Sequence, residues 1–143
     1  MSTQTVAAEN IVFRKTNTHT GRRISVSPSN STMQHLAYGR IILSDADPSV
    51  SFNTGDRETG LICLNGEAEV TVDGSTIEIG KYDSVYVPRD SSLEVRTGSS
   101  VDIAEFSADV SRKYPLQVIR YADVLKDPGL KSLRLAVPAA RGI

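Results

Sequence analysis

The chain is poor in the residues from which enzymes build reactive centres. Its 143 residues include two histidines, one cysteine and no tryptophan. A zinc, manganese or iron site needs several imidazole, thiolate or carboxylate donors that converge on one point. The sequence also contains no Gly-rich phosphate loop, no nucleophile elbow and no Cys-x-x-Cys pair. We therefore expect neither a metal nor another cofactor.

Blocks of one charge and long apolar runs are missing too. The 16 basic and 17 acidic residues are mixed along the chain, and the net charge is −1. This balance gives no long-range attraction to nucleic acid or to an anionic membrane. No apolar run approaches the length of about 20 residues that crosses a bilayer, and the first 15 residues lack the apolar core of a signal peptide. We expect a cytoplasmic protein without nucleic-acid or membrane partners.

Short strands separated by turn residues fill the middle of the chain. The alternation of apolar and polar residues predicts strands over residues 61–65, 67–72, 75–79, 83–87, 92–96 and 101–107. Asn65-Gly66 and Asp73-Gly74 separate the first three, and such pairs favour type I′ hairpins between consecutive antiparallel strands. Evenly spaced short strands are typical of a sandwich or a barrel. We predict one all-β domain, an antiparallel double-sheet barrel of the jelly-roll kind.

The segments before and after the predicted barrel are expected to contain few regular elements. Residues 1–32 read as an N-terminal arm over the surface, with an edge strand at residues 11–14, and Arg22-Arg23 there fit a common solubility feature. The barrel takes residues 33–110, with a further strand over 38–43. Residues 111–143 are expected to hold a strand at 116–121, a short helix at 122–126 ended by Asp127-Pro128-Gly129, and a tail. Leu133, Leu135 and Val137 suit the tail for docking against another domain or subunit.

Strand alternation also predicts which side chains face the interior. One phase turns ten apolar or small residues inward: Phe52, Thr54, Leu61, Cys63, Val70, Val72, Leu93, Val95, Val101 and Ile103. Cys63 is then a small core residue. The same phase directs Arg57 and Glu105 toward the mouth or lumen of the barrel. Arg57 and Glu105 could pair and close one end, Arg57 could clamp a ligand carboxylate with its bidentate fork, or it could be exposed to solvent.

Tyr86 is a third candidate for ligand contact. Its phase is opposite to that of Val85 and Val87, so we expect it to pack between sheets or subunits rather than to donate a catalytic proton. Acidic residues that alternate with apolar ones are expected on solvated strand faces; these are Glu67, Glu69, Glu78 and Glu94.

Several segments resemble one family. Four segments are similar to the amino-terminal half of the sugar-acid ketol-isomerases. They are Gly-Asp-Arg-Glu-Thr-Gly-Leu (55–61), Leu-Asn-Gly-Glu-Ala-Glu-Val-Thr-Val-Asp-Gly (64–74), Glu-Ile-Gly (78–80) and Asp-Ser-Val-Tyr-Val-Pro (83–88). The isomerases are 5-deoxyglucuronate isomerase and 5-keto-4-deoxyuronate isomerase. Three residue pairs narrow the resemblance from cupins in general to this family: Arg57-Glu58, Ser107-Ala108 and Tyr114-Pro115. The similar region runs from about Tyr38 to Lys126. These isomerases are bicupins, so the resemblance implies a cupin fold. Because they are roughly twice as long as this chain, the resemblance covers only one of their two halves.

The chain departs from this pattern at the positions of the metal ligands. A metal-binding cupin has a His-x-His before a glutamate and a third histidine later, and the resemblance puts these positions near Phe52 and Thr54, near Thr59, and at Leu93. None of these residues binds a divalent ion. The two histidines lie elsewhere, His19 in the arm and His35 beside the strand at 38–43. The resemblance implies that the metal and the acid–base groups belong to the carboxy-terminal cupin.

Two functions of different class remain open. The chain is either the non-metal half, or a separate partner, of a catalytic cupin in carbohydrate or inositol catabolism. Alternatively it is a metal-free single-domain cupin that binds a small sugar acid or acts as a dimeric assembly module without turnover. In both cases we expect a homodimer or pairing with a second cupin domain, because an isolated half should expose an apolar sheet face.

Overall fold

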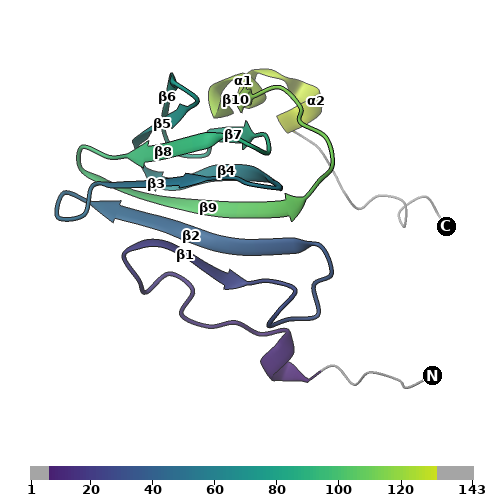
Figure 1. Ribbon diagram of the computed structural model, residues 1–143. Helices are drawn as coiled ribbons and strands as arrows, with labels where there is room; N and C mark the ends of the chain where they lie inside the picture. Colours follow the sequence, from purple (N-terminus) through teal and green to yellow (C-terminus); the bar gives the residue numbers. More distant parts are fainter. Residues whose placement is uncertain (1–6, 132–143) are drawn as a thin grey trace.

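Two antiparallel sheets face each other in the computed structural model, which describes residues 7–131 (Figure 1). The first sheet has six strands in the order β1 (Gly21–Val26), β2 (Leu36–Ser44), β9 (Ser100–Asp109), β4 (Arg57–Gly66), β7 (Ser84–Val87) and β10 (Gln117–Ile119). The second has four, β3 (Ser49–Asn53), β8 (Ser92–Arg96), β5 (Ala68–Val72) and β6 (Ser75–Ile79). The predicted all-β double-sheet jelly roll is confirmed, although among the described residues no strand ladder joins the two sheets into a closed barrel.

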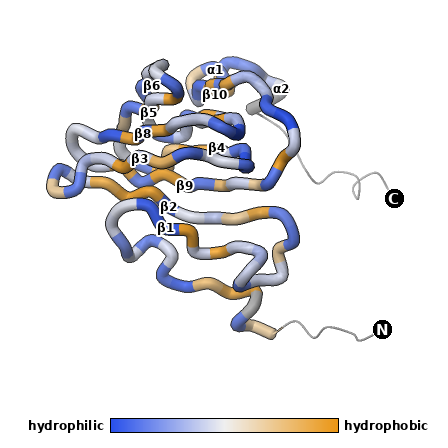
Figure 2. The backbone as a smooth tube through the Cα atoms, viewed as in Figure 1, coloured by the Kyte–Doolittle hydropathy of each residue, from blue (hydrophilic) through white to orange (hydrophobic). Residues whose placement is uncertain are grey.

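The core lies between the inner faces of the two sheets. Both contribute fully buried aliphatic side chains, among them Leu61 and Ile103 from the six-stranded sheet and Val70 and Val95 from the four-stranded sheet. Apolar segments follow the strands and polar segments mark most turns (Figure 2). The predicted inward phase is confirmed at every apolar position, except that Phe52 is only partly buried. An interior packed with aliphatic side chains leaves little room for a ligand.

The two predicted hairpins have different outcomes. Asp73 and Gly74 have φ values of 47° and 88° and join β5 to β6, as expected of a type I′ turn. The prediction of a hairpin at Asn65-Gly66 is wrong, because β4 and β5 belong to different sheets. Here the chain crosses between sheets after a bulge at the end of β4. A side chain at Gly66 would collide with the backbone of Ser100, so only glycine permits this crossing.

The N-terminal region departs most from the prediction. Residues 11–14 form no strand, and the expected surface arm contains β1, which pairs with β2 at the edge of the six-stranded sheet. Gly39 on β2 lets β1 approach, because a side chain there would meet the Arg23 carbonyl and the Ile24 side chain. β3 was not predicted as a separate strand either. Both strands are rich in polar residues, so their period-2 signal is weak.

The C-terminal elements agree with the prediction as far as the structure describes them. β10 extends the six-stranded sheet beside β7, and α1 (Tyr121–Lys126) follows it, while a second short helix, α2 (Pro128–Lys131), begins after the predicted stop. The predicted docking residues of the tail, Leu133, Leu135 and Val137, lie outside the described residues. A one-turn 3-10 helix, η1 (Ala8–Asn10), precedes β1. No helix within residues 7–131 is long and apolar enough to cross a membrane.

Asp83, in the turn before β7, ties α1 to the barrel. Its carboxylate accepts hydrogen bonds from the backbone N–H groups of Gly80 and Tyr121, both at 2.9 Å, and from the Arg120 guanidinium at 3.3 Å. Burial by itself would raise the pKa of Asp83, but these donors outweigh it and hold the pKa below its usual value. The carboxylate is therefore stabilised in its ionised form.

Candidate functional site

Polar side chains gather at one end of the inner face of the six-stranded sheet. We call this group the mouth cluster; it consists of Arg22, Arg57, Thr59, Glu105, Ser107 and Asp109. Glu105, Ser107 and Asp109 alternate along β9 and so share its inner side, and Arg57 and Thr59 on β4 pair in register with Asp109 and Ser107. Thr59, Glu105 and Ser107 are buried. The structure thus brings the predicted residues Arg57 and Glu105 to the same end of the barrel.

Glu105 has a partner that the sequence did not suggest. Its carboxylate accepts two hydrogen bonds from Nε of Arg22 on β1, at 2.7 and 3.0 Å, so the expected Arg57–Glu105 pair does not form. The Glu105 side chain is 0% exposed and that of Arg22 is 32% exposed. The Arg22 guanidinium also lies 3.7 Å from the centre of the Phe52 ring. Arg22, Phe52 and Glu105 therefore form a stacked, charge-neutral plug between the two sheets.

Arg57 lies at the rim of the barrel. Its Nε donates to Asp109 at 3.2 Å and its Nη1 donates to the Ser107 hydroxyl at 3.4 Å. Its side chain is 41% exposed and that of Asp109 is 75% exposed, so water screens this ion pair. Within the described residues its Nη2 has no hydrogen-bond acceptor. Arg57 therefore keeps one donor free for a ligand oxygen, whereas both oxygens of the buried Glu105 carboxylate already accept from Arg22.

The positions at which the resemblance places cupin metal ligands do not fit a metal ion. The Phe52 ring packs on Arg22, and Leu93 is buried in the core. The Thr54 hydroxyl donates to the carbonyl of Pro88 at 2.8 Å and accepts from the backbone N–H of Ser91 at 3.0 Å. Thr59 has a hydroxyl where a carboxylate is needed, and hard or borderline divalent cations require several stronger donors. No chemical step through a metal can be derived at this place.

The histidines and the cysteine do not supply a site elsewhere in residues 7–131, where no group of three His, Cys, Asp or Glu side chains is spaced to hold a metal ion. Nε2 of His19 lies 3.1 Å from the Arg40 carbonyl oxygen, and His35 is exposed. Cys63 is fully buried, as predicted for a core residue, and its burial raises the pKa of the thiol. A thiol of raised pKa is a poor nucleophile.

Tyr86 points away from the mouth cluster, onto the outer face of the six-stranded sheet. Its hydroxyl donates to Glu58 at 2.5 Å, and its neighbours Val85 and Val87 are buried on the inner side, so the predicted phase is confirmed. Burial, then the hydrogen bond to Glu58 and then the negative charge of Glu58 raise the pKa of Tyr86 to about 12. A phenol of raised pKa stays protonated at neutral pH and is unsuited to act as a base. Tyr86 shares no site with Arg57 or Glu105.

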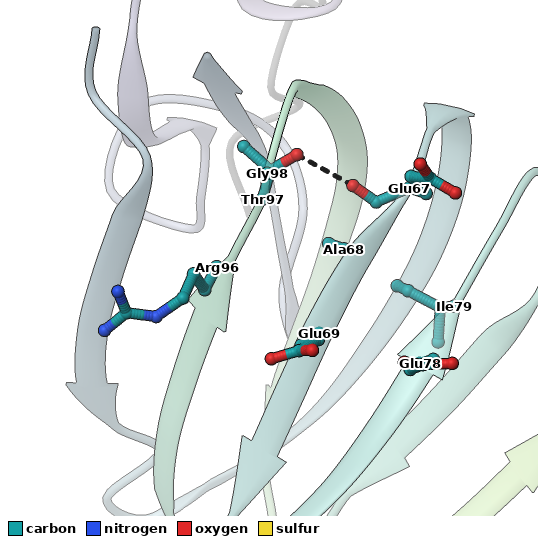
Figure 3. A pocket seen from close by; sticks show the side chains of 8 residues that line it. All are labelled: Glu67, Ala68, Glu69, Glu78, Ile79, Arg96, Thr97 and Gly98. Atoms are coloured by element: carbon teal, nitrogen blue, oxygen red, sulfur yellow. Dashed lines mark hydrogen bonds between the residues drawn. The ribbon is translucent and has the colours of Figure 1, made fainter. Parts of the chain in front are cut away.

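An acidic hollow of about 370 Å³ lies at the ends of β5, β6 and β8 (Figure 3). Glu69 is flanked in register by Glu78 on β6 and Arg96 on β8. Arg96 lies 3.5 Å from Glu94 on its own strand, and the Thr97 hydroxyl donates to the Glu67 carbonyl. Glu67, Glu69 and Glu78 are exposed, as the alternation predicted. These carboxylates form a solvated strand surface without a neighbouring acid–base group.

Comparisons with known proteins agree with this fold. The profile of the KduI/IolB family matches residues 11–128. The 4-deoxy-L-threo-5-hexosulose-uronate ketol-isomerase of Pectobacterium carotovorum subsp. carotovorum is 26% identical over 123 residues, covering 71% of this chain and 44% of that protein. This chain therefore spans less than half the length of that relative.

Two solved structures have the same architecture. An IolB-like protein from Salmonella typhimurium LT2 superposes with a TM-score of 0.64 at 22% identity, over 73% of this chain and 43% of that protein. A cupin protein from Bacteroides fragilis superposes with a TM-score of 0.54 at 14% identity, over 80% of this chain and 90% of that protein. At these identities the two structures show the cupin-type fold alone.

Proposed function

Because this chain belongs to the KduI/IolB family, we propose that it is a non-catalytic cupin that acts in sugar-acid metabolism as the metal-free half, or the separate partner, of a catalytic cupin. The relative that it matches is a sugar-acid ketol-isomerase of more than twice the matched length. Ketol isomerisation moves a proton between adjacent carbons and needs a base together with a Lewis acid or donor on the carbonyl oxygen.

The side chains that fill the barrel interior are the main support for this proposal. Among residues 7–131 its one fully buried carboxylate, Glu105, is paired with Arg22, and Phe52 lies against the Arg22 guanidinium. The Glu105 side chain is 0% exposed and both of its oxygens are bonded to Arg22, so a substrate at the mouth cannot contact this carboxylate. Most of the remaining inner residues are aliphatic, and the hydroxyls of Thr54 and Ser107 are hydrogen-bonded. The mouth cluster thus stabilises the barrel and offers no assembled base and carbonyl donor.

An isomerase assay tests this proposal. The purified chain is incubated with 4-deoxy-L-threo-5-hexosulose uronate, first alone and then with Zn²⁺, Mn²⁺ or Fe²⁺. We expect no turnover above the protein-free reaction. A metal-carrying KduI/IolB-family cupin from the same source is then added, and we expect the chain to bind it and to change its rate or stability. Turnover proportional to the concentration of the isolated chain, or no association with the catalytic cupin, would contradict the proposal.

Binding of a small sugar acid at Arg57 is the second candidate function. The observation that favours it is the free Nη2 donor on a half-exposed guanidinium at the rim, beside the Ser107 hydroxyl. A guanidinium in this position can offer parallel donors to a carboxylate while part of it stays hydrated. Calorimetric titration with glucuronate tests this function, and the absence of binding heat at millimolar ligand would reject it.

A further inference from the structure

A basic hollow lies at the free edge of β1, and the proposed function does not use it. β1 is an outer strand of the six-stranded sheet, and the segment of residues 12–16 runs beside its free edge (Figure 1). No backbone hydrogen bond joins this segment to β1. The two line a hollow of about 310 Å³, to which Arg14, Lys15 and Arg23 contribute and no acidic residue does. We call it the edge hollow.

The three cations of the edge hollow are not neutralised by the chain itself. Within residues 7–131 the side chains of Arg14, Lys15 and Arg23 form no hydrogen bond, ion pair or ring contact, and all three are exposed. The other arginines on strands are each paired with a carboxylate; these are Arg22, Arg40, Arg57 and Arg96. Arg23 is in register with Arg40, another cation, whose own partner is Asp102. Three positive charges therefore gather where an external anion can reach them.

Ser25 on β1 adds a neutral donor to the same hollow. Its Oγ is shielded from solvent and has no hydrogen-bond partner within the described residues, although Ser25 lines the edge hollow. A buried hydroxyl without a partner costs free energy, and a bound ion is one explanation for such a group. The neighbouring Asn30 is already engaged, because its amide donates to the Ser25 carbonyl and its oxygen accepts from the Ser27 N–H. An acceptor oxygen inside the hollow would satisfy the Ser25 hydroxyl.

Lys15 has a backbone conformation that lysine does not favour. Its φ of 58° lies in the left-handed region, which asparagine and aspartate tolerate better than other residues with a side chain. The Thr18 hydroxyl donates to the Lys15 carbonyl at 3.0 Å and stabilises the turn that follows. This bond to the backbone would form equally well with asparagine at position 15. Since strained residues cluster at ligand sites, the lysine charge itself is a reason for its presence.

The charges and donors of the edge hollow suit a phosphate group. A phosphate monoester carries about 1.5–2 negative charges at pH 7 and three acceptor oxygens, whereas a carboxylate carries one charge. Three cations therefore compensate a phosphate better than they compensate a carboxylate. The volume of about 310 Å³ lies at the lower end of the range of about 300–1,000 Å³ for small-molecule sites. Phe13 and Ile24 also line the hollow and offer apolar walls for the carbon atoms of a small ligand.

We propose that the edge hollow binds the phosphate group of a small phosphorylated metabolite. Arg14 and Arg23 donate parallel hydrogen bonds to the phosphate oxygens, Lys15 adds a point charge, and the Ser25 hydroxyl is the neutral donor. Guanidinium and ammonium groups bind phosphate in these two ways. The anion thus supplies the partners that these four side chains lack within the chain.

The edge hollow is separate from the mouth cluster. Arg22 and Arg23 are adjacent on β1, so their side chains point to opposite faces of the sheet. Arg22 pairs with Glu105 between the sheets, whereas Arg23 lines the edge hollow. No residue of the mouth cluster lines the hollow. Phosphate binding here depends neither on the proposed function nor on sugar-acid binding at Arg57.

Calorimetric titration at low ionic strength tests the proposal with inorganic phosphate and glucose 6-phosphate as probes. We expect each to bind once per chain and to compete with the other, and glucose not to bind. Arg23→Gln should weaken the binding of both probes about tenfold, the scale of one lost charge-assisted hydrogen bond. Lys126→Gln is the matched control, because it removes an exposed positive charge from α1, which follows the strand at the opposite edge of the sheet. Its affinity should equal that of the wild type.

Two further variants separate binding from folding. Lys15→Asn removes the charge and suits the left-handed φ, and Ser25→Ala removes the hydroxyl that has no partner. Both should keep or raise the melting temperature of the free protein and weaken phosphate binding severalfold. Arg57→Gln should leave phosphate affinity unchanged, because Arg57 lies outside the hollow.

Four results would overturn the proposal. The first is the absence of binding heat with both probes at millimolar concentration. The second is an equal loss of affinity in Lys126→Gln, which would show that the anion responds only to net charge. The third is a loss in Arg57→Gln, which would place the anion at the rim of the barrel. The fourth is glucuronate binding as tight as that of glucose 6-phosphate and equally dependent on Arg23, which would make the hollow a carboxylate site.

Discussion

Two ion pairs on the inner side of β9 have the same chemistry and differ in their exposure to water. Arg22 and Glu105 are sealed between the sheets under Phe52, whereas Arg57 and Asp109 lie at the rim. Glu105 and Asp109 are only four residues apart on β9, so the same strand places one carboxylate in the core and another at the solvent-exposed rim. A carboxylate in a cupin interior is therefore not by itself a catalytic group. Its partner and its access to water decide what it does.

The largest effect is expected at the buried pair. Arg22→Met keeps an apolar stem of similar length but leaves Glu105 buried and uncompensated, so unfolding free energy should fall by about 3–5 kcal/mol. Chemical denaturation measures this loss. The double variant with Arg22→Met and Glu105→Leu should recover most of the stability, because no charge then remains buried. A single variant as stable as the wild type would mean that the plug is not structural.

The exposed pair should affect ligand binding rather than folding. If Arg57 binds a sugar acid, Arg57→Lys keeps the charge but loses the fork, and affinity for glucuronate should fall by about 1–3 kcal/mol. Calorimetry beside a melting curve measures both quantities. Unchanged affinity with a lowered melting temperature would remove Arg57 from the binding site and leave it a structural role.

Asp83 offers a carboxylate of intermediate burial, with its side chain 16% exposed. Asp83→Asn weakens three hydrogen bonds to an ionised acceptor and should cost about 1–2 kcal/mol at neutral pH. Because the folded-state pKa of Asp83 is lowered, its contribution is present above the unfolded-state pKa and is lost as pH falls through the folded-state value. The difference between wild type and variant should therefore shrink in acid. A difference that stays constant with pH would contradict this assignment.

The smallest effect is expected at Asp109. Its side chain is 75% exposed, and exposed ion pairs contribute between 0 and about 1 kcal/mol. Asp109→Asn should therefore change the free energy of unfolding by less than about 1 kcal/mol, and added salt should reduce the difference further. A loss as large as that of Arg22→Met would show that burial does not separate the two pairs.

The alternation of residues predicted the faces of the strands but not their sheets. Val70, Val95 and Ile103 are buried as expected, because side-chain phase is a local property with a period of two. Which strands pair is a long-range property, and the Asn65-Gly66 turn misled because its glycine serves a crossing between sheets. The residues of Asp73-Gly74 have the same character but do form the hairpin.

The candidate site was predicted only in part. Phase brought Arg57 and Glu105 to one end of the barrel, as the structure confirms, but their partners come from distant elements. Arg22 was missed because β1 is a polar edge strand, and two adjacent arginines resemble a solvated arm. A signal was present in the alternation of Arg22, Ile24 and Val26, which is weak evidence for a strand.

The metal content of the isolated chain tests most directly the claim that this barrel interior is structural. The protein is incubated with Zn²⁺, Mn²⁺ or Fe²⁺, dialysed and subjected to elemental analysis. Because the positions of the cupin ligands hold Phe52, Thr54, Thr59 and Leu93, we expect no stoichiometric metal. About one ion per chain, lost in a Glu105→Gln or His35→Ala variant, would contradict the account.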